Sequence, residues 1–152
     1  MNSEFTVAVH SLVFLNHKNR VTRSEDIAQN VCTHPARVRK VLSRLKKAGL
    51  VTSREGQRGG GYAFAGDPAR VTLLQVLDAL DERIVSAGWA SGDMDMECLI
   101  ASGMGAIMGG IYDELDQLCR ERLSQTTIAD IDRQIFGDGV NGRQAFGILE
   151  KK

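Results

Sequence analysis

The stretch from residue 21 to residue 64 constrains the fold of this chain more than any other feature. Its pattern predicts a helix, a short turn, a second helix and a strand, followed by a glycine-rich hairpin and a second strand. Two helices joined by a short turn and followed by a two-stranded hairpin are the parts of a winged helix-turn-helix. We therefore expect a fold that is mainly α with a small β-hairpin wing.

Local signals predict where the two helices of this stretch begin and end. Thr22–Glu25 has the spacing of a capping box and predicts the start of the first helix. Pro35 is tolerated in the first turn of the second helix, with Thr33 or His34 as its cap. Gly49 closes that helix, because glycine readily adopts the left-handed conformation at a helix C-terminus.

The second helix has separate apolar and basic faces. Its apolar residues fall within an arc of about 100°, and four basic residues fall within a separate arc of about 80°. The apolar face consists of Val38, Val41, Leu42 and Leu45, and the basic ridge consists of Arg37, Lys40, Arg44 and Lys47. A charged ridge is usually a solvated surface. Because the second helix of a helix-turn-helix enters the major groove of DNA, we interpret this ridge as facing DNA.

The hairpin has the composition of a wing. Its three consecutive glycines permit close backbone approach. Arg54, Gln57 and Arg58 can reach phosphate or the minor groove. A nucleotide phosphate loop is the alternative for such glycines, but that loop precedes a helix with a Lys-Ser/Thr pair, which is missing at this point of the sequence.

Charge is divided along the chain. The formal net charge is zero, but residues 1–65 carry a balance of +7 and residues 66–152 a balance of −7. The basic half attracts a polyanion, and the acidic half is repelled from it. We find no apolar run that could cross a membrane and no signal-peptide pattern. The three cysteines are widely spaced and form no disulfide framework, so we expect a cytoplasmic protein.

Helical patterns flank the winged unit. The segment from Ser3 to about His17 is apolar nearly all round, which predicts a helix buried on most of its surface. A second capping box at Thr72–Gln75 opens a helix that ends near Arg83, and Thr127 caps a short last helix. Residues 85–97 have no period and predict a loop.

A long helix from about Leu99 or Met104 to Leu123 is expected to pair with a partner helix. Its apolar residues are spaced four, three, four and three apart, which is typical of helix pairing. This predicted dimer seam consists of Met104, Met108, Ile111, Leu115 and Leu118. We therefore divide the chain into a DNA-binding domain (1–83), a candidate sensor loop (84–98), dimerisation helices (99–136) and a tail (137–152).

Several motifs in combination resemble one family. They are the helix-turn-helix with a proline near the start of its second helix, the KKAGLV junction, the RGGGY wing, the TLLQVLDAL helix, a cysteine beyond it and the closing QTTIADI. Together they are similar to the Rrf2 family of bacterial winged-helix transcription regulators. The resemblance implies a homodimer, with the helix near residues 104–123 as the interface. It also implies binding to a partly palindromic operator in double-stranded DNA, most often with repression.

The resemblance further implies which residues contact DNA. The recognition helix would span His34 to Ala48, and the hairpin matches the family's wing. The residues that we expect to bind DNA are Thr33, His34, Arg37, Lys40, Arg44, Arg54, Arg58, Gly59 and Gly60.

Cys98 is the candidate sensor residue. Cluster-binding members of the family carry three cysteines in this region, whereas the further positions here hold Ala101, Ser102 and Met104. One thiolate cannot hold an iron–sulfur cluster, so we expect no cofactor and no metal. We expect the acidic residues before Cys98 to raise its pKa. A redox-sensing thiol and an inert thiol both stay open. A metal site completed by His10, Cys119 or the other subunit also stays open, as does a Cu(I) site with the soft ligands Met94, Met96, Cys98 and Met104.

Two other classes of function make different predictions. An enzyme is disfavoured, because the three histidines lie in the first 34 residues, away from the carboxylate-rich half, and no nucleophile and base are paired. A winged-helix module that binds protein instead of DNA is the alternative. It predicts weak, salt-insensitive binding to duplex DNA, whereas phosphate contacts make binding strongly salt-dependent.

Overall fold

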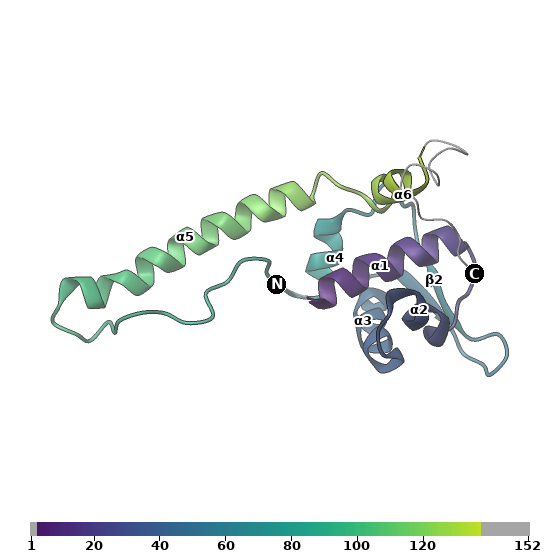
Figure 1. The fold of residues 1–152 in the computed structure, drawn as a ribbon, viewed down its shortest axis with the longest axis horizontal. Helices are drawn as coiled ribbons and strands as arrows, with labels where there is room; N and C mark the ends of the chain where they lie inside the picture. The colour runs from purple at the N-terminus through teal and green to yellow at the C-terminus, as the bar shows by residue number, and fades with distance from the viewer. Residues whose placement is uncertain (1–2, 138–152) are drawn as a thin grey trace.

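The computed structural model describes residues 3–137, so the predicted tail lies outside the described residues beyond Gly137. Within this range the chain is mainly helical with one two-stranded antiparallel sheet, which confirms the expected fold class. Figure 1 shows the winged unit and α6 gathered in one body, with α5 extending away from it. The elements are α1 (Ser3–Lys18), α2 (Ser24–Val31), α3 (Pro35–Lys47), β1 (Val51–Arg54), β2 (Gly61–Phe64), α4 (Leu73–Ala79), α5 (Leu99–Leu123) and α6 (Ile128–Phe136).

Helix α1 runs through the middle of this body. It packs against α2, α3, α4, α6 and β2, and its residues Ala8, Leu12 and Leu15 are fully buried. Removing apolar surface from water stabilises a fold by about 25 cal/mol per Å². The buried residues of the same core come from α2, α3, β1 and the α4 region: Ile27, Val38, Val41, Leu42, Leu45, Val51, Val76 and Leu80.

Thr22 does not cap α2, and the predicted capping box is wrong. Helix α2 begins at Ser24 with Arg23 in the N-cap position, and the hydroxyl of Thr22 donates to the Arg20 carbonyl at 3.1 Å. The backbone of Thr22 pairs with the wing instead. Its N–H donates to the Tyr62 carbonyl at 2.8 Å, and the Tyr62 N–H donates to the Thr22 carbonyl at 2.9 Å. This bridge attaches the wing to the helix-turn-helix.

Helix α3 and the hairpin follow the sequence prediction. Gly49 lies just beyond the end of α3 with a φ of +76°, as a closing glycine should. Strand β1 pairs antiparallel with β2, with Val51 opposite Phe64. At the start of β2, Gly61 has a φ of +147°, and a Cβ there would overlap the Thr22 carbonyl. Glycine is therefore required where the wing meets the bridge.

Thr72 and Thr127 cap the starts of α4 and α6 as predicted, and both form full capping boxes, of which only the one at Thr72 was predicted. The Thr72 hydroxyl accepts from the Gln75 N–H, and the Thr127 hydroxyl accepts from the Asp130 N–H. Helix α4 ends at Ala79, earlier than expected. A backbone bridge between Thr72 and Thr127 joins the starts of the two helices. Helix α6 therefore returns to the body and packs on α1.

Helix α5 projects from the body, and the loop before it runs outward alongside the helix to its far tip, where α5 begins (Figure 1). Residues 81–98 form no helix or strand, which confirms the predicted loop. The Asp93 N–H donates to the Ala101 carbonyl at 3.0 Å. Gly92 comes so close to the same carbonyl that a Cβ would not fit. The loop and the N-terminal part of α5 are thus in direct contact.

Asp116 of α5 anchors the start of this loop. Its side chain is only 7% exposed, and Arg83 Nε lies 3.4 Å from it. It accepts from the N–H groups of Ile84 at 3.0 Å and Val85 at 2.9 Å. Burial opposes the charge, but these donors and Arg83 together lower the pKa of Asp116. The stabilisation is present above the usual aspartate pKa and is lost as the pH falls through the lowered value.

We expect Asp116→Ala to lower the free energy of unfolding by about 2 kcal/mol, because two half-buried N–H groups lose their acceptor. Asp113→Ala is the matched control, since Asp113 binds the same Arg83 at 2.7 Å but is largely exposed. Its loss should stay below about 0.5 kcal/mol. Urea denaturation at pH 7 measures both variants, and hydrogen exchange at Ile84 and Val85 reports local loosening. Equal losses in the two variants would contradict the anchoring role.

Candidate nucleic-acid interface

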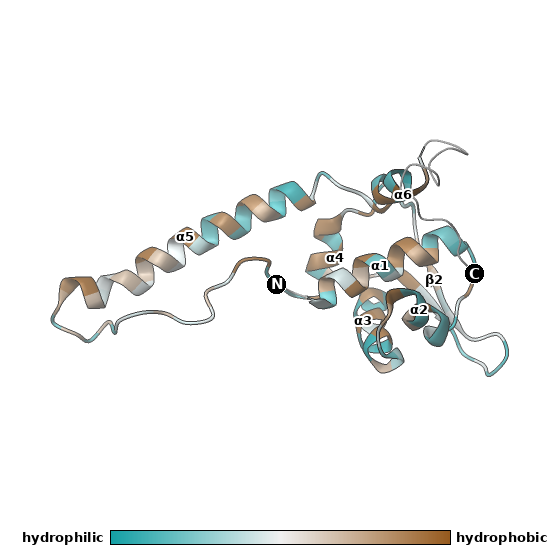
Figure 2. Ribbon diagram, in the orientation of Figure 1, coloured by the Kyte–Doolittle hydropathy of each residue, from teal (hydrophilic) through white to brown (hydrophobic). Residues whose placement is uncertain are grey.

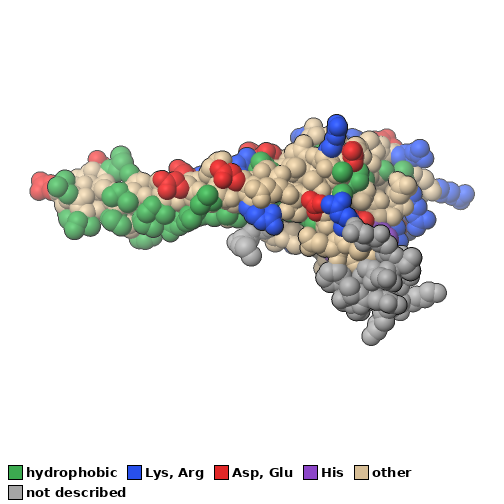
Figure 3. All heavy atoms as spheres, turned by 90° about the horizontal axis from the view of Figure 1, so that it is seen from above, with side chains coloured by type: hydrophobic (Ala, Val, Ile, Leu, Met, Phe, Trp, Pro, Cys, Tyr) green, Lys and Arg blue, Asp and Glu red, His purple; other side chains and the backbone are tan. Residues whose placement is uncertain are grey.

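Basic side chains gather on the body, away from the tip of α5. Figure 3 shows Lys and Arg side chains at the end of the molecule formed by the winged unit, whereas hydrophobic and acidic side chains cover the projecting helix. Helix α3 contributes many of the basic groups. Its exposed residues are Ala36, Arg39, Lys40, Ser43, Lys46 and Lys47.

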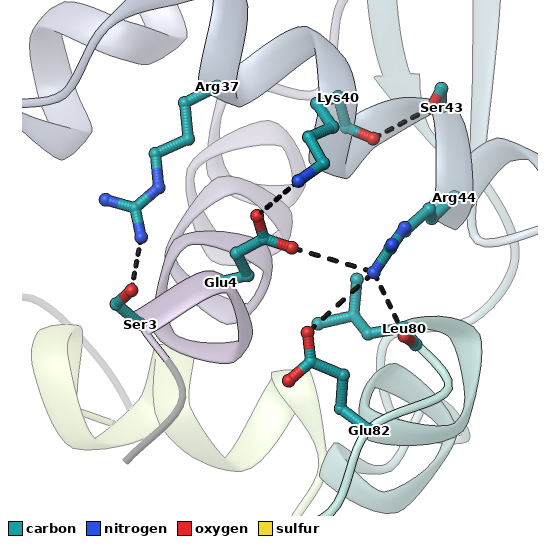
Figure 4. A network of polar contacts seen from close by, with 8 residues as sticks. All are labelled: Ser3, Glu4, Arg37, Lys40, Ser43, Arg44, Leu80 and Glu82. Carbon is teal, nitrogen blue, oxygen red and sulfur yellow. Dashed lines mark hydrogen bonds and ion pairs between the residues drawn. The ribbon is translucent and has the colours of Figure 1, made fainter.

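Glu4 of α1 binds two residues of the predicted basic ridge (Figure 4). Lys40 Nζ lies 2.9 Å from one carboxylate oxygen of Glu4, and Arg44 Nη1 lies 3.6 Å from the other. The hydrogen bond from Lys40 lowers the pKa of Glu4, and the charges of Arg44 and Arg37 act in the same direction against partial burial. Glu4 therefore neutralises part of the ridge.

Further contacts hold the same flank of α3 against the protein (Figure 4). Arg44 donates to the Leu80 carbonyl at 3.1 Å and lies 3.8 Å from Glu82 at the end of α4. Arg37 donates to the hydroxyl of Ser3. Arg44 therefore helps to hold α3 against the end of α4, while 39% of its side chain stays exposed.

The opposite flank of α3 carries two basic residues that the sequence reasoning missed. Arg39 and Lys46 are seven positions apart, so they lie on one side of the helix. Arg39 donates to the Ser24 hydroxyl at 3.3 Å and lies 3.7 Å from Glu25, and Lys46 donates to the Ser53 hydroxyl at 2.5 Å. These residues line a groove of about 580 Å³ between the start of α2, α3 and the wing. The seven-residue spacing of Arg39 and Lys46 was the sequence signal that could have placed them together on one side of α3.

The wing is exposed where its predicted contacts lie. Arg54 and Arg58 are both exposed. The Gly60 N–H donates to the Gly56 carbonyl at 3.1 Å, and a Cβ on Gly60 would overlap that carbonyl. Gly59 has open space at the same point. Gly60 therefore shapes the tight hairpin, whereas Gly59 leaves room for an approaching backbone.

The start of α3 carries the last two predicted DNA contacts. His34 is the exposed N-cap residue, and Thr33 before it is half-buried. Backbone N–H groups at a helix N-terminus attract phosphate, so this position suits a backbone contact. Contact with DNA by Thr33, His34 and the other predicted residues stays a prediction.

The predicted seam of α5 is only partly covered within the described residues. Met104 and Met108 are half-buried, while Ile111, Leu115 and Leu118 are 42%, 43% and 60% exposed. The hydrophobic colour in Figure 2 is strongest toward the tip of α5. Three exposed apolar residues there lie outside the predicted seam: Leu99, Ile100 and Ile107.

Cys98 is exposed and occupies the N-cap position of α5. The backbone N–H groups of Ala101 and Ile100 lower the pKa of its thiol, because they stabilise the thiolate. The expectation that the preceding acidic residues raise this pKa is therefore wrong. Within residues 3–137, no group of three or more His, Cys, Asp or Glu side chains is arranged to hold a metal ion. Sensing at Cys98 stays a prediction.

Comparison with known proteins identifies the family. The profile of the Rrf2 family, described as "Iron-dependent Transcriptional regulator", matches residues 1–134. The chain belongs to the Rrf2 family. It is 27% identical over 136 residues to the protein named as HTH-type transcriptional regulator YwnA in Bacillus subtilis, which covers 90% of this chain and 99% of that one.

Two solved structures share the fold of this Rrf2 chain. A structure from Lactobacillus plantarum, described as a transcriptional regulator, has a TM-score of 0.77 at 24% identity and covers 98% of this chain and 100% of that one. The structure of CymR, described as the global cysteine regulator of Bacillus subtilis, has a TM-score of 0.63 at 21% identity, with 87% and 95% covered. The fold is that of Rrf2 winged-helix regulators.

This Rrf2 chain is a DNA-binding transcription regulator and not an enzyme, as the rest of its family is made up of regulators. The winged unit with its basic α3 is the part suited to that activity. In the described part of the chain, every helix is too short or too polar to cross a membrane.

The iron dependence in the family description does not fit the cysteines of this chain. Cys32 follows α2, Cys98 begins α5, and Cys119 lies more than five turns further along α5. We expect protein purified without oxygen to be colourless and to lack stoichiometric iron and sulfide. A visible absorption spectrum with iron and sulfide analysis measures this. A brown sample with both elements in stoichiometric amount would show that ligands outside this set complete a cluster.

Proposed function

We propose that this chain is a homodimeric repressor that binds a partly palindromic operator. One observation carries the proposal: an exposed basic surface on α3 and the wing occurs together with an exposed apolar face on α5. The basic surface can contact phosphates and base edges. The apolar face can pair with a second copy, which would present two recognition helices to half-sites related by the same two-fold symmetry.

The apolar face of α5 supports pairing with an identical helix. Ile107, Ile111, Leu115 and Leu118 are exposed and are spaced four, four and three apart, so they lie on one side of α5. Contiguous exposed apolar surface of this kind marks an interaction site. An antiparallel pair of α5 helices would cover both stripes at once.

We expect Ile111→Asp to convert the dimer to a monomer, because a charge at the centre of the seam would be buried without a partner. Gln117→Asp is the control, since Gln117 is exposed on another side of the same helix. Sedimentation equilibrium gives the mass of each variant. Affinity for a full operator should fall with the loss of the dimer, while a monomeric wild-type chain would contradict the proposal.

Arg39 and Lys46 provide the cleanest test of DNA contact, because they do not join α3 to α1 or α4. We expect each alanine variant to weaken operator binding and to reduce the slope of log affinity against log salt concentration by about 1. Arg70→Ala, an exposed cation between β2 and α4, is the matched control. Fluorescence anisotropy at several salt concentrations measures all three. Salt-insensitive binding by the wild type would favour the protein-binding alternative.

Repression and sensing complete the proposal. An operator that overlaps a promoter excludes polymerase, so adding the chain to a transcription reaction on such a template should lower the transcript. The candidate sensor loop ends at Cys98, where the lowered thiol pKa favours reactive thiolate. Oxidation there would act beside the exposed tip of α5, close to the proposed partner surface. Alkylation of Cys98 that leaves operator affinity unchanged would argue against a sensing role.

A further inference from the structure

A groove of about 660 Å³ lies between α1 and α6. Figure 1 shows α6 on one side of α1 and α3 on the other. The volume falls in the range of roughly 300–1,000 Å³ that small-molecule sites occupy. Both walls are mainly apolar, with Phe5, Val9, Val13 and Phe14 on α1 and Ile131 and Ile135 on α6. Neither the proposed DNA contacts nor the α5 seam includes these residues.

The charged and polar groups of the groove favour an anion. Among the described residues that line it, none is acidic, and Lys18 carries a positive charge at the end of α1. Its Nζ lies 5.2 Å from the centre of the Phe14 ring, so the ammonium stands beside the apolar wall. His10 Nε2 and Asn30 Oδ1 are hydrogen-bonded at 2.8 Å. A single lysine complements one negative charge, whereas a polyphosphate would need several cations.

The groove also favours a planar ring. The His17 ring stacks on the Phe136 ring with their centres 4.2 Å apart and their planes 8° from parallel. Both residues line the groove, together with Phe5 and Phe14. A pair of aromatic rings contributes about 0.5–1.5 kcal/mol of stabilisation in addition to that from the apolar area it buries. An aromatic ligand therefore finds matching surfaces here.

We propose that this groove binds a small monocarboxylic acid with an aromatic body. The carboxylate pairs with Lys18, and the ring packs between the apolar walls of α1 and α6. Helix α1 links the groove to the recognition helix, since Phe5 lines the groove and the adjacent Glu4 binds Lys40 and Arg44 of α3. A ligand that shifts α1 against α3 would change how far Glu4 neutralises the basic ridge. This coupling rests on the proposed DNA-binding function, whereas ligand binding does not.

Calorimetric titration of the full chain with 4-phenylbutyrate, indole-3-acetate and 2-naphthoate, each beside its neutral amide, tests the proposal. We expect at least one acid to bind more tightly than its amide. Lys18→Met should weaken binding of that acid by about fivefold and leave the amide unchanged, because one charge-assisted contact is lost at a partly exposed site. Arg20→Met, a nearby exposed cation outside the groove, should change neither.

Val9→Trp should fill the groove from α1 and abolish binding, and Ile135→Trp does the same from α6 if the first variant fails to fold. Several results would overturn the proposal: no acid binds, acid and amide bind equally, or Lys18→Met has no effect. Binding only by a chain that ends at Gly137 would show that residues 138–152 occupy the groove. If sedimentation equilibrium gave a lower molecular mass for Val9→Trp than for the wild type, a second copy of the chain would be what covers the groove. Operator affinity without acid, measured separately, shows whether the DNA-binding function holds.

Discussion

Burial of α1 is the constraint on which the rest of this structure depends. The helix is in contact with α2, α3, α4, α6 and β2, and its inward residues are removed from water. A chain of this size has few other ways to bury enough apolar surface. Helix α3, the wing and α6 all take their positions from the same helix. The chain leaving α1 enters the bridge at Thr22 directly, so the wing is also placed by where α1 ends.

Ion pairs and hydrogen bonds within the winged unit hold the basic side chains of α3 in place, but they also compete with phosphate for the same charges. Glu4 holds Lys40 and Arg44 in defined positions, which would reduce the conformational entropy that these side chains lose if they contact DNA as proposed. The same carboxylate competes with phosphate for their charge. On the other flank of α3, Arg39 and Lys46 donate mainly to hydroxyls of Ser24 and Ser53, which are weaker competitors than a carboxylate. The basic side chains on the two flanks of α3 therefore differ in how strongly their own partners compete with a polyanion.

Features determined within one helical turn could be predicted from the sequence, and features determined by distant partners could not. The caps at Thr72 and Thr127 and the closing Gly49 depend on neighbouring residues, and all three were predicted correctly. The capping box at Thr22 failed because Tyr62, forty positions away, takes its backbone groups. Along the candidate interface, periodicity gave the core face of α3, but the contacts of its two flanks depend on α1, α2 and α4. The pKa of Cys98 was misjudged because the backbone N–H groups of the first turn of α5 stabilise its thiolate.

The length of α5 has a consequence for how operators of this regulator can change. At about 1.5 Å per residue, the 25 residues of α5 span about 37 Å, close to the 34–36 Å between major grooves on one face of DNA. If two such helices pair, their length and register set the distance between the recognition helices. Inserting one residue would lengthen α5 only slightly but would rotate its apolar stripe by about 100°. In the proposed dimer, half-site spacing could therefore change only in steps that restore the stripe, which means whole turns of α5.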